Sequence, residues 1–452
     1  MIEYGLVVLS LINAFVSTKM YIKVSETLSP RRLNLISFFY YYFVILSFIG
    51  SILLTLDINS FYMSTSLKNP EGSMLTGWIL INLVMGLTPI TMLVIQRFFP
   101  NSKHVFNDFC ERPVSEYQSS RNLFLGTAFF SLIGLVALVY VVKIIGFGNL
   151  PVINALQGAS VEELAVLRQL VGRGFKGNIY IRNFLSFGII PLMSYVAFVE
   201  MVRSKKKEWI ILFGLLFVLS SLILTYDLQK APILRYLFTY FILIQLFMKP
   251  ISPRLFRSGV AGLVAIILCF YMFVTPIPMN ELFSFNRGPV NRVLKSQVFP
   301  TYLHMDIFPA RHEFLVGASF PTAISTNVFG VDHIRSGRLV MEIVRPEAVA
   351  DGTAGVLNTL YVAEAYANFS WLGAILGIVW VSVMFYLIHL LILSQEKTAI
   401  TIALYAYIAN LLVNATQVGF VDFIFNPGLV FVFGLAIALT LIAYPNKFNR
   451  GK

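Results

Sequence analysis

Charged residues are scarce in this sequence, at 12% of 452 positions, whereas ordinary soluble domains carry about 25%. The uncharged residues instead run in repeated blocks of roughly 18 to 25, and each block is long enough to cross a ~30 Å hydrocarbon core as a helix. A soluble core would show shorter amphipathic segments with a charged outer face. The scarcity of charge therefore excludes a soluble globular protein and predicts an all-α, polytopic integral membrane protein.

Cysteine is also nearly absent. Cys110 lies in a short basic loop and Cys269 within an apolar block, so we expect them at different depths and predict no disulfide framework. The first residues, Met1-Ile2-Glu3-Tyr4-Gly5, lack a basic n-region, and no small-residue cleavage pattern follows. We interpret this start as a retained first span.

The apolar blocks predict about eleven transmembrane helices in one membrane domain, 1–452, without internal repeats. Their approximate bounds are 4–18, 34–56, 75–95, 122–145, 183–202, 209–226, 232–248, 258–278, 369–393, 398–418 and 427–444.

Acidic residues are few, and the net charge is +12. Nineteen Lys and Arg residues fall in alternate short loops and the carboxyl-terminal tail, whereas the intervening short loops hold only Lys68 and Lys230. Because basic residues mark cytoplasmic loops, this alternation predicts an amino terminus outside and a carboxyl terminus inside. It also accounts for most of the positive charge without a nucleic-acid partner.

Two longer segments fall outside on this topology, about 146–182 and about 279–356, and they hold eleven basic residues. The orientation rule does not explain these residues, so we expect function in these segments. In the first, Ser160 and Glu163 form a capping-box pattern that predicts a short helix to about Val171, ended by Gly172 and Gly174. In the second, the broken apolar stretch 314–331 is interpreted as a surface-lying or re-entrant piece.

The candidate anion-binding residues are basic side chains on the outer side. Arginine and lysine there can bind phosphate oxygens, although anchoring to lipid headgroups and snorkelling remain alternative interpretations. Arg235 lies about one turn inside an apolar block, where a charge usually faces a cavity or the bundle interior. The candidates are Arg173, Lys176, Arg182, Lys230, Arg235, Arg287, Arg292 and Lys295.

The candidate general bases are His312, Glu313 and Glu364, because neighbouring Arg residues and burial can tune either residue type. The sequence has no HExxH, no paired Cys and no DxD, so we predict no metal site and no cofactor. Asn410, Asn414 and Gln417 share one face of a span, which is typical of hydrogen bonds between helices.

Together these features resemble the Wzy-type polymerases of bacterial O-antigen and capsule repeat units, which are related to the O-antigen ligases. The topology carries the resemblance, along with the two basic external segments and two stretches, Asp227–Leu234 and Glu364–Gly373. In the second stretch Ser370 stands where the family pattern has Gly, and an Arg-x10-Gly motif of some members is absent. The resemblance implies glycosyl transfer between undecaprenyl-pyrophosphate-linked oligosaccharides at the outer face of the bacterial cytoplasmic membrane. It also implies membrane lipids and a chain-length regulator protein as candidate partners.

In that reaction the departing pyrophosphate needs positive charge, and we expect Arg173, Arg235 and Arg292 to converge on it. An O-antigen ligase, which differs in its acceptor, remains an alternative. A transporter or flippase of a lipid-linked glycan is the rival from another class, and it would show broken spans. Glycosyltransferases that use lipid-monophosphate sugars carry acidic residues in an external loop after the first span; here that loop is basic and inside, so they are disfavoured.

Overall fold

The computed structural model describes residues 2–59, 61–115, 120–172, 174–248, 252–273, 284–285, 288–351 and 355–444. These residues form helices and connecting loops without a strand, which confirms the all-α class for the described part of the chain. The chain divides into two compact units. Unit 1 comprises Met1–Phe106, Ile277–Leu391 and Leu411–Asn426, and unit 2 comprises Asn107–Pro276, Ile392–Asn410 and Pro427–Lys452.

Nine helices of the described residues are long and apolar enough to cross a membrane. They are Ile2–Ser25, Leu35–Leu56, Pro70–Phe98, Ser120–Ile145, Ile181–Ser204, Lys207–Thr225, Lys230–Phe247, Tyr361–Leu393 and Phe420–Ala443. A tenth expected span is an apolar helix of 17 residues, α19 (Ala399–Ala415). The remaining one, expected at 258–278, is helical as α12 (Pro253–Phe273), and 274–278 lie outside the described residues. A polytopic membrane protein is thus confirmed, while the count of eleven and the orientation stay predictions.

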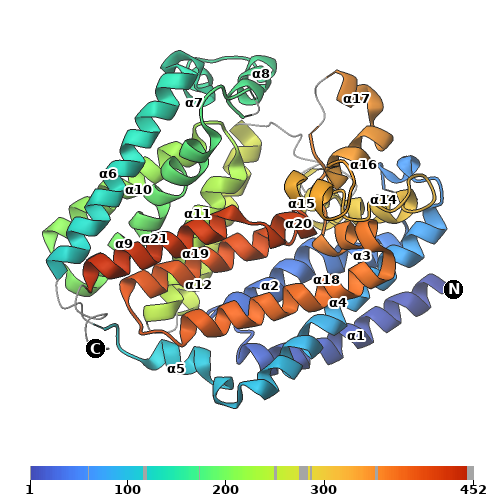
Figure 1. The fold of residues 1–452 in the computed structure, drawn as a ribbon, viewed down its shortest axis with the longest axis horizontal. Coiled ribbons are helices and arrows are strands. Elements are labelled where there is room, and N and C mark those ends of the chain that lie inside the picture. The colour runs from blue at the N-terminus through green and yellow to red at the C-terminus, as the bar shows by residue number, and fades with distance from the viewer. Residues whose placement is uncertain are drawn as a thin grey trace. The chain divides into compact units, whose positions relative to one another are not determined.

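Unit 1 begins with three candidate spans joined by polar contacts. They are α1 (Ile2–Ser25), the continuous run of α2 (Leu35–Phe43), η1 (Val44–Phe48) and α3 (Ile49–Leu56), and α4 (Pro70–Phe98). Helix α1 runs beside α4 (Figure 1). Asn13 Nδ2 donates to the backbone oxygen of Asn82 at 2.9 Å, and Trp78 Nε1 donates to Ser10 Oγ at 2.7 Å. Such hydrogen bonds hold helices together in lipid, where the hydrophobic effect does not.

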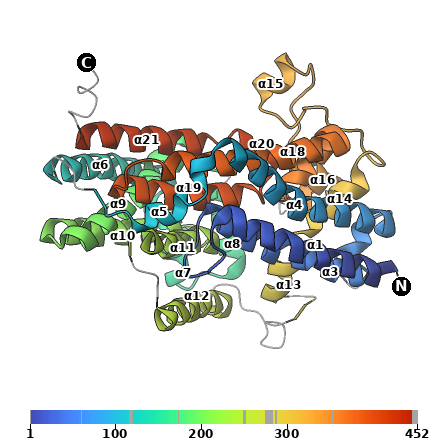
Figure 2. The ribbon, with the colours of Figure 1, turned by 90° about the horizontal axis from the view of Figure 1, so that it is seen from below.

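The rest of unit 1 contains short helices and one long helix. They are α13 (Gly288–Leu294), α14 (Phe299–Ile307), α15 (Thr322–Asn327), α16 (Ser336–Val344), α17 (Pro346–Ala350), α18 (Tyr361–Leu393, of which the part to Leu391 belongs to this unit) and α20 (Phe420–Ile424). Helix α14 packs against α4, and α15 projects from its neighbours in this unit (Figure 2). The broken stretch 314–331 is therefore mostly loop around one short helix.

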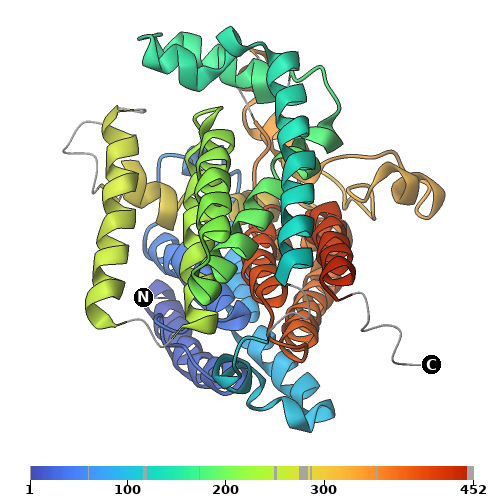
Figure 3. The same cartoon turned by 90° about the vertical axis from the view of Figure 1, so that its left-hand side faces the viewer.

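The described residues of unit 2 form seven long helices, of which α19 belongs to this unit only up to Asn410, and the first external segment. The elements are α6 (Ser120–Ile145), η4 (Phe147–Asn149), α7 (Pro151–Leu156), α8 (Val161–Gly172), η5 (Ile181–Ser186), α9 (Ile189–Ser204), α10 (Lys207–Thr225), α11 (Lys230–Phe247), α12, α19 and α21 (Pro427–Ala443); α5 (Val105–Glu111) lies at its start. Helices α9 and α10 lie side by side, and α7 and α8 lie across the carboxyl-terminal end of α6 (Figure 3).

Two local predictions are confirmed. Helix α8 begins after a capping box, in which Glu163 N donates to Ser160 Oγ at 3.2 Å and Ser160 N donates to Glu163 Oε2 at 2.8 Å. The polar face of the tenth span bonds to other helices: Asn410 Nδ2 donates to Thr239 Oγ1, Tyr42 donates to Asn414 Oδ1, and Gln417 Nε2 donates to Ser47 Oγ.

Candidate functional site

The basic residues of unit 2 have different environments. Lys176 and Arg235 are exposed, whereas Arg182 and Lys230 are half-buried. Arg173 lies outside the described residues. Arg235 Nε donates to the backbone oxygen of Ala231 at 3.3 Å, within its own helix.

Arg182 holds the end of a helix. Its Nη1 donates to the backbone oxygens of Val171 at 3.1 Å and Gly172 at 3.0 Å, and its guanidinium lies over the Phe175 ring at 4.8 Å. The last carbonyls of a helix have no partner within it, and a basic side chain can satisfy them. Arg182 therefore stabilises the end of α8.

Asp227 is an acidic neighbour of these arginines that sequence reasoning did not single out as a site. It is 8% exposed, in the loop between α10 and α11. Burial raises the pKa of its carboxyl, and the Gln229 backbone N–H and the charges of Arg168 and Arg182 partly oppose that rise.

In unit 1, Arg287 lies outside the described residues, Arg292 is exposed on α13, and Lys295 is buried at 6% exposure. Burial lowers the pKa of Lys295, and the nearby negative charge of Asp57 partly restores it. The predicted convergence of Arg173, Arg235 and Arg292 stays a prediction, because these residues belong to different units and Arg173 is not described.

His312 and Glu313 lie in a half-exposed turn after α14. His312 Nδ1 is 2.7 Å from the backbone oxygen of Glu313, and since a carbonyl only accepts, Nδ1 is the donor. In the neutral ring the other nitrogen, Nε2, is then the atom that can accept a proton.

The chain that follows His312 and Glu313 docks on α18. Leu315 N donates to the backbone oxygen of Ala367 at 2.9 Å, and Val316 N donates to that of Asn368 at 3.1 Å. Asn368 is fully buried, and its side chain accepts from Gly317 N and donates to Ser319 Oγ. The structure thus brings two sequence-predicted regions together, the His312–Glu313 turn and the first turns of α18, which carry Glu364.

Helix α18 is broken just after Asn368. Phe369 has φ −137° and ψ 27°, and Ser370 has φ 56° and ψ −149°. The conformation of Ser370 is one that glycine adopts readily and other residues rarely. Gly373 fits the same break, since a Cβ there would lie 2.2 Å from the backbone oxygen of Ala365. Glu364 therefore lies on a short helical segment that the break separates from the rest of α18.

The carboxylate of Glu364 is buried, with the residue 5% exposed. Its Oε1 accepts from Ser336 Oγ at 2.9 Å, its Oε2 accepts from the backbone N–H of Val421 at 3.0 Å, and the backbone N–H of Phe420 also donates to the carboxylate. No Arg or Lys among the described residues forms an ion pair with it. Glu364 is thus oriented from two sides but not neutralised.

A second carboxylate lies beside Glu364. A Cβ built on Gly419 would be 2.5 Å from Glu364 Oε2 and 3.5 Å from Asp422 Oδ2, so the two oxygens are no farther apart than these two distances combined. Asp422 is half-exposed and pairs with Arg335 at 3.5 Å. Adjacent residues at the start of α16, Arg335 and Ser336, therefore contact the two acids.

Sequence reasoning missed Arg335, Ser336 and Asp422. The nearest signal was the placement of Arg335 in the second external segment, where the orientation rule does not account for basic residues. Paired acids carry out general acid and base chemistry when their surroundings differ, as they do here: one is buried and the other is exposed and ion-paired. We take Glu364, Asp422, Arg335 and Ser336 as the candidate site.

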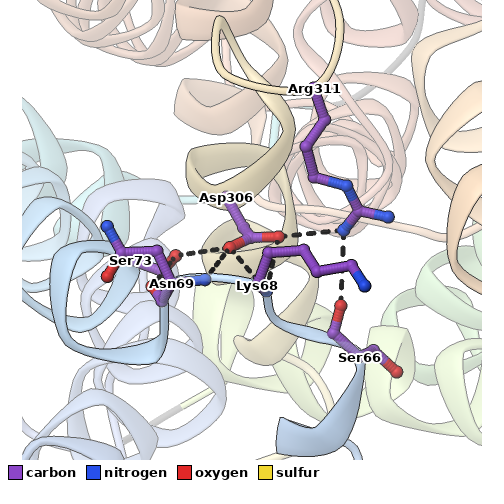
Figure 4. Close-up of polar contacts among 6 residues, drawn as sticks. All are labelled: Ser66, Lys68, Asn69, Ser73, Asp306 and Arg311. Carbon is purple, nitrogen blue, oxygen red and sulfur yellow. Dashed lines mark hydrogen bonds and ion pairs between the residues drawn. The ribbon is translucent and has the colours of Figure 1, made fainter.

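Another buried acid, Asp306, has a different environment (Figure 4). Its carboxylate accepts from Lys68 N and Asn69 N at 2.9 and 2.8 Å, from Ser73 Oγ at 3.2 Å and from Arg311 Nη1 at 2.9 Å. Burial alone would raise its pKa, but these donors and the Arg311 charge bring it below the ordinary value. Asp306 fastens α14 to the start of α4.

His304, two residues earlier, is fully buried, and burial lowers its pKa to about 4, so the ring is neutral near pH 7. Among the described residues no group of three His, Cys, Asp or Glu is placed to hold a metal ion.

Comparison of the chain with protein-family models, curated proteins and solved structures finds no match.

Proposed function

We propose that this protein transfers a glycan between polyprenyl-pyrophosphate-linked oligosaccharides at the outer face of the cytoplasmic membrane, as the Wzy-type polymerases do. The observation that carries the proposal is the buried, oriented and un-neutralised carboxylate of Glu364, with Asp422 beside it. The polytopic helical fold also supports it, because polyprenyl tails require a protein embedded in lipid.

The chemistry requires a base and a means to stabilise a leaving group. Glu364 would take the proton of the acceptor hydroxyl as that oxygen bonds to the anomeric carbon of the donor. The bond from the anomeric carbon to the pyrophosphate oxygen breaks, and the pyrophosphate leaves with the electron pair. Arg335, next to the acids, would stabilise the developing negative charge, together with the basic residues of the external segments.

The test replaces the base without changing its shape. Glu364→Gln should reduce transfer about 10²- to 10⁴-fold per molecule, the range for loss of a general base. The surface glycan of a strain that carries only this variant should collapse to single repeat units at normal protein abundance. Glu342→Gln is the matched control, because Glu342 lies on α16 and pairs with Arg338 at the surface. A normal ladder from Glu364→Gln would refute the assignment of the base.

The same strains separate a polymerase from a ligase. Deletion of a polymerase leaves single repeat units, whereas deletion of a ligase leaves a full ladder on the lipid carrier. We therefore propose a polymerase and expect the first pattern.

A second candidate, a transporter of a lipid-linked glycan, is favoured by the interruptions within candidate spans. These are the π-helical segments Val44–Phe48 and Ile181–Ser186 and the break at Phe369–Ser370. Transporters use interrupted helices to form their binding sites. Purified protein in liposomes would move a fluorescent lipid-linked oligosaccharide across the bilayer if it were a transporter, and would instead lengthen it if it were a polymerase.

A further inference from the structure

Four phenylalanine rings gather beside the candidate site. Phe320 contacts Phe329, Phe369 and Phe425, with ring centroids 5.5, 6.3 and 5.8 Å apart, and Phe329 contacts Phe369 at 5.9 Å. They come from three parts of unit 1: the loop around α15, the break in α18, and the end of α20. We call these four residues the aromatic platform.

The platform is not a closed core. Phe425 is 38% exposed, and the other three rings are partly exposed. A fully buried aromatic cluster would need no further partner, but these rings keep apolar surface available at the edge of the candidate site.

Each part of the platform is tied to a residue of the site. Phe369 follows Glu364 by five positions, and Phe425 follows Asp422 by three, with Phe425 N donating to the backbone oxygen of Val421. The backbone oxygen of Phe320 is 2.7 Å from His333 Nδ1, two residues before Arg335. The turns and loops that carry the rings are therefore the same ones that carry the charged groups of the site.

We infer that the aromatic platform binds a sugar ring of the acceptor glycan, with Asp422 and Arg335 contacting its hydroxyl groups. A pyranose has apolar C–H faces and a polar rim, and this surface offers both complements side by side. An isoprenoid chain would need only the apolar part and would gain nothing from the half-exposed ion pair at 3.5 Å. The inference rests on the proposed function and names the binding mode of its substrate.

The experiment measures binding separately from turnover. The protein in lipid nanodiscs is titrated with lipid-free oligosaccharide repeat units, released by mild acid from the lipid-linked intermediates of the source cells, and separately with farnesyl pyrophosphate. Phe425→Leu keeps apolar volume and removes the ring, so it should weaken the oligosaccharide about tenfold and leave farnesyl pyrophosphate unchanged. Phe425→Trp should retain oligosaccharide affinity, and Phe129→Ala, on an exposed face of α6, is the control.

Three results would overturn the inference. They are no oligosaccharide binding to the unaltered protein, oligosaccharide binding that Phe425→Leu leaves intact, and a Phe425→Leu effect confined to farnesyl pyrophosphate. Phe425→Leu and Phe425→Trp are compared at matched thermal stability, so that misfolding is not mistaken for lost binding. Glu364→Gln should bind the oligosaccharide normally while losing transfer. If the platform fails and Glu364→Gln still abolishes transfer, the proposed function stands without it.

Discussion

Asp306 and Glu364 are two buried carboxylates of the same unit, and their surroundings differ in kind. Asp306 accepts from two backbone N–H groups and a hydroxyl and is neutralised by Arg311. Glu364 is buried as deeply and also accepts from a hydroxyl and backbone N–H groups, but no arginine pairs with it among the described residues, and its charged neighbour is another acid. A carboxylate paired with an arginine is poorly suited to take up a proton, whereas an oriented carboxylate without an ion pair is poised to do so. Burial alone therefore does not distinguish a structural acid from a catalytic one.

The largest expected effect is on the stability of the protein, and it comes from removing the carboxylate of Asp306. Asp306→Ala should lower the free energy of unfolding by about 3 to 5 kcal/mol, because it leaves Arg311 and two backbone N–H groups without their acceptor. Abundance and thermal stability should fall, with transfer per folded molecule unchanged. Asp351→Ala, at the exposed end of α17, is the control. An Asp306→Ala variant that is stable but inactive would contradict the assignment of Asp306 as the structural acid and Glu364 as the catalytic one.

Removing one donor from Glu364 should give a smaller effect. Ser336→Ala loses a hydrogen bond to a charged group, worth about 1.5 to 3 kcal/mol, and should slow transfer about ten- to a hundredfold by releasing the carboxylate from its orientation. Ser336→Thr keeps the hydroxyl and should recover most of the rate. Equal loss in both variants would mean that α16 packing, rather than the hydroxyl, matters.

The break in α18 carries a backbone cost that can be measured. Ser370→Gly should raise the free energy of unfolding by about 1 kcal/mol, because glycine adopts φ 56° and ψ −149° without the penalty of a side chain. Ser370→Ala keeps the strain and should not stabilise the protein. The melting temperatures of the two variants are measured by thermal unfolding in nanodiscs. Equal values would contradict backbone strain at Ser370.

The smallest effect concerns pH. The pKa of Asp306 is lower in the folded protein than in the unfolded chain, so its stabilisation is complete above the unfolded value of about 4. It is lost as the pH falls through the lower, folded value. Asp306→Asn should therefore show a flatter decline of stability with acidification, whereas Glu342→Gln should follow the unaltered protein.

The helices were predictable because span length follows directly from the bilayer thickness, and the α8 start because its capping box is local in sequence. Of the candidate site only Glu364 was predicted, because the contacts that complete the site are distant in sequence: Ser336 and Glu364 lie 28 positions apart, and Arg335 and Asp422 lie 87 apart. The break in α18 could not be predicted from local sequence either, since neither Pro nor Gly stands at Phe369 and Ser370. Arg182 was predicted as an anion ligand on its charge, although helix ends also attract basic side chains.

The hydrogen bonds from Leu315 and Val316 to α18 constrain two separate stretches of the sequence, the loop before α15 and the start of α18, to change together. A straight helix would use the carbonyls of Ala367 and Asn368 itself, and the break releases them for the two loop N–H groups. Deleting the loop residues would leave the two carbonyls without a donor, and a substitution that made α18 continuous would leave the two loop N–H groups without an acceptor. Gly317 and Asn368, 51 positions apart, fall under the same constraint. Recombination between diverged copies of this chain would therefore have to exchange both stretches together, while length changes at the tip of α15 leave the pairing untouched.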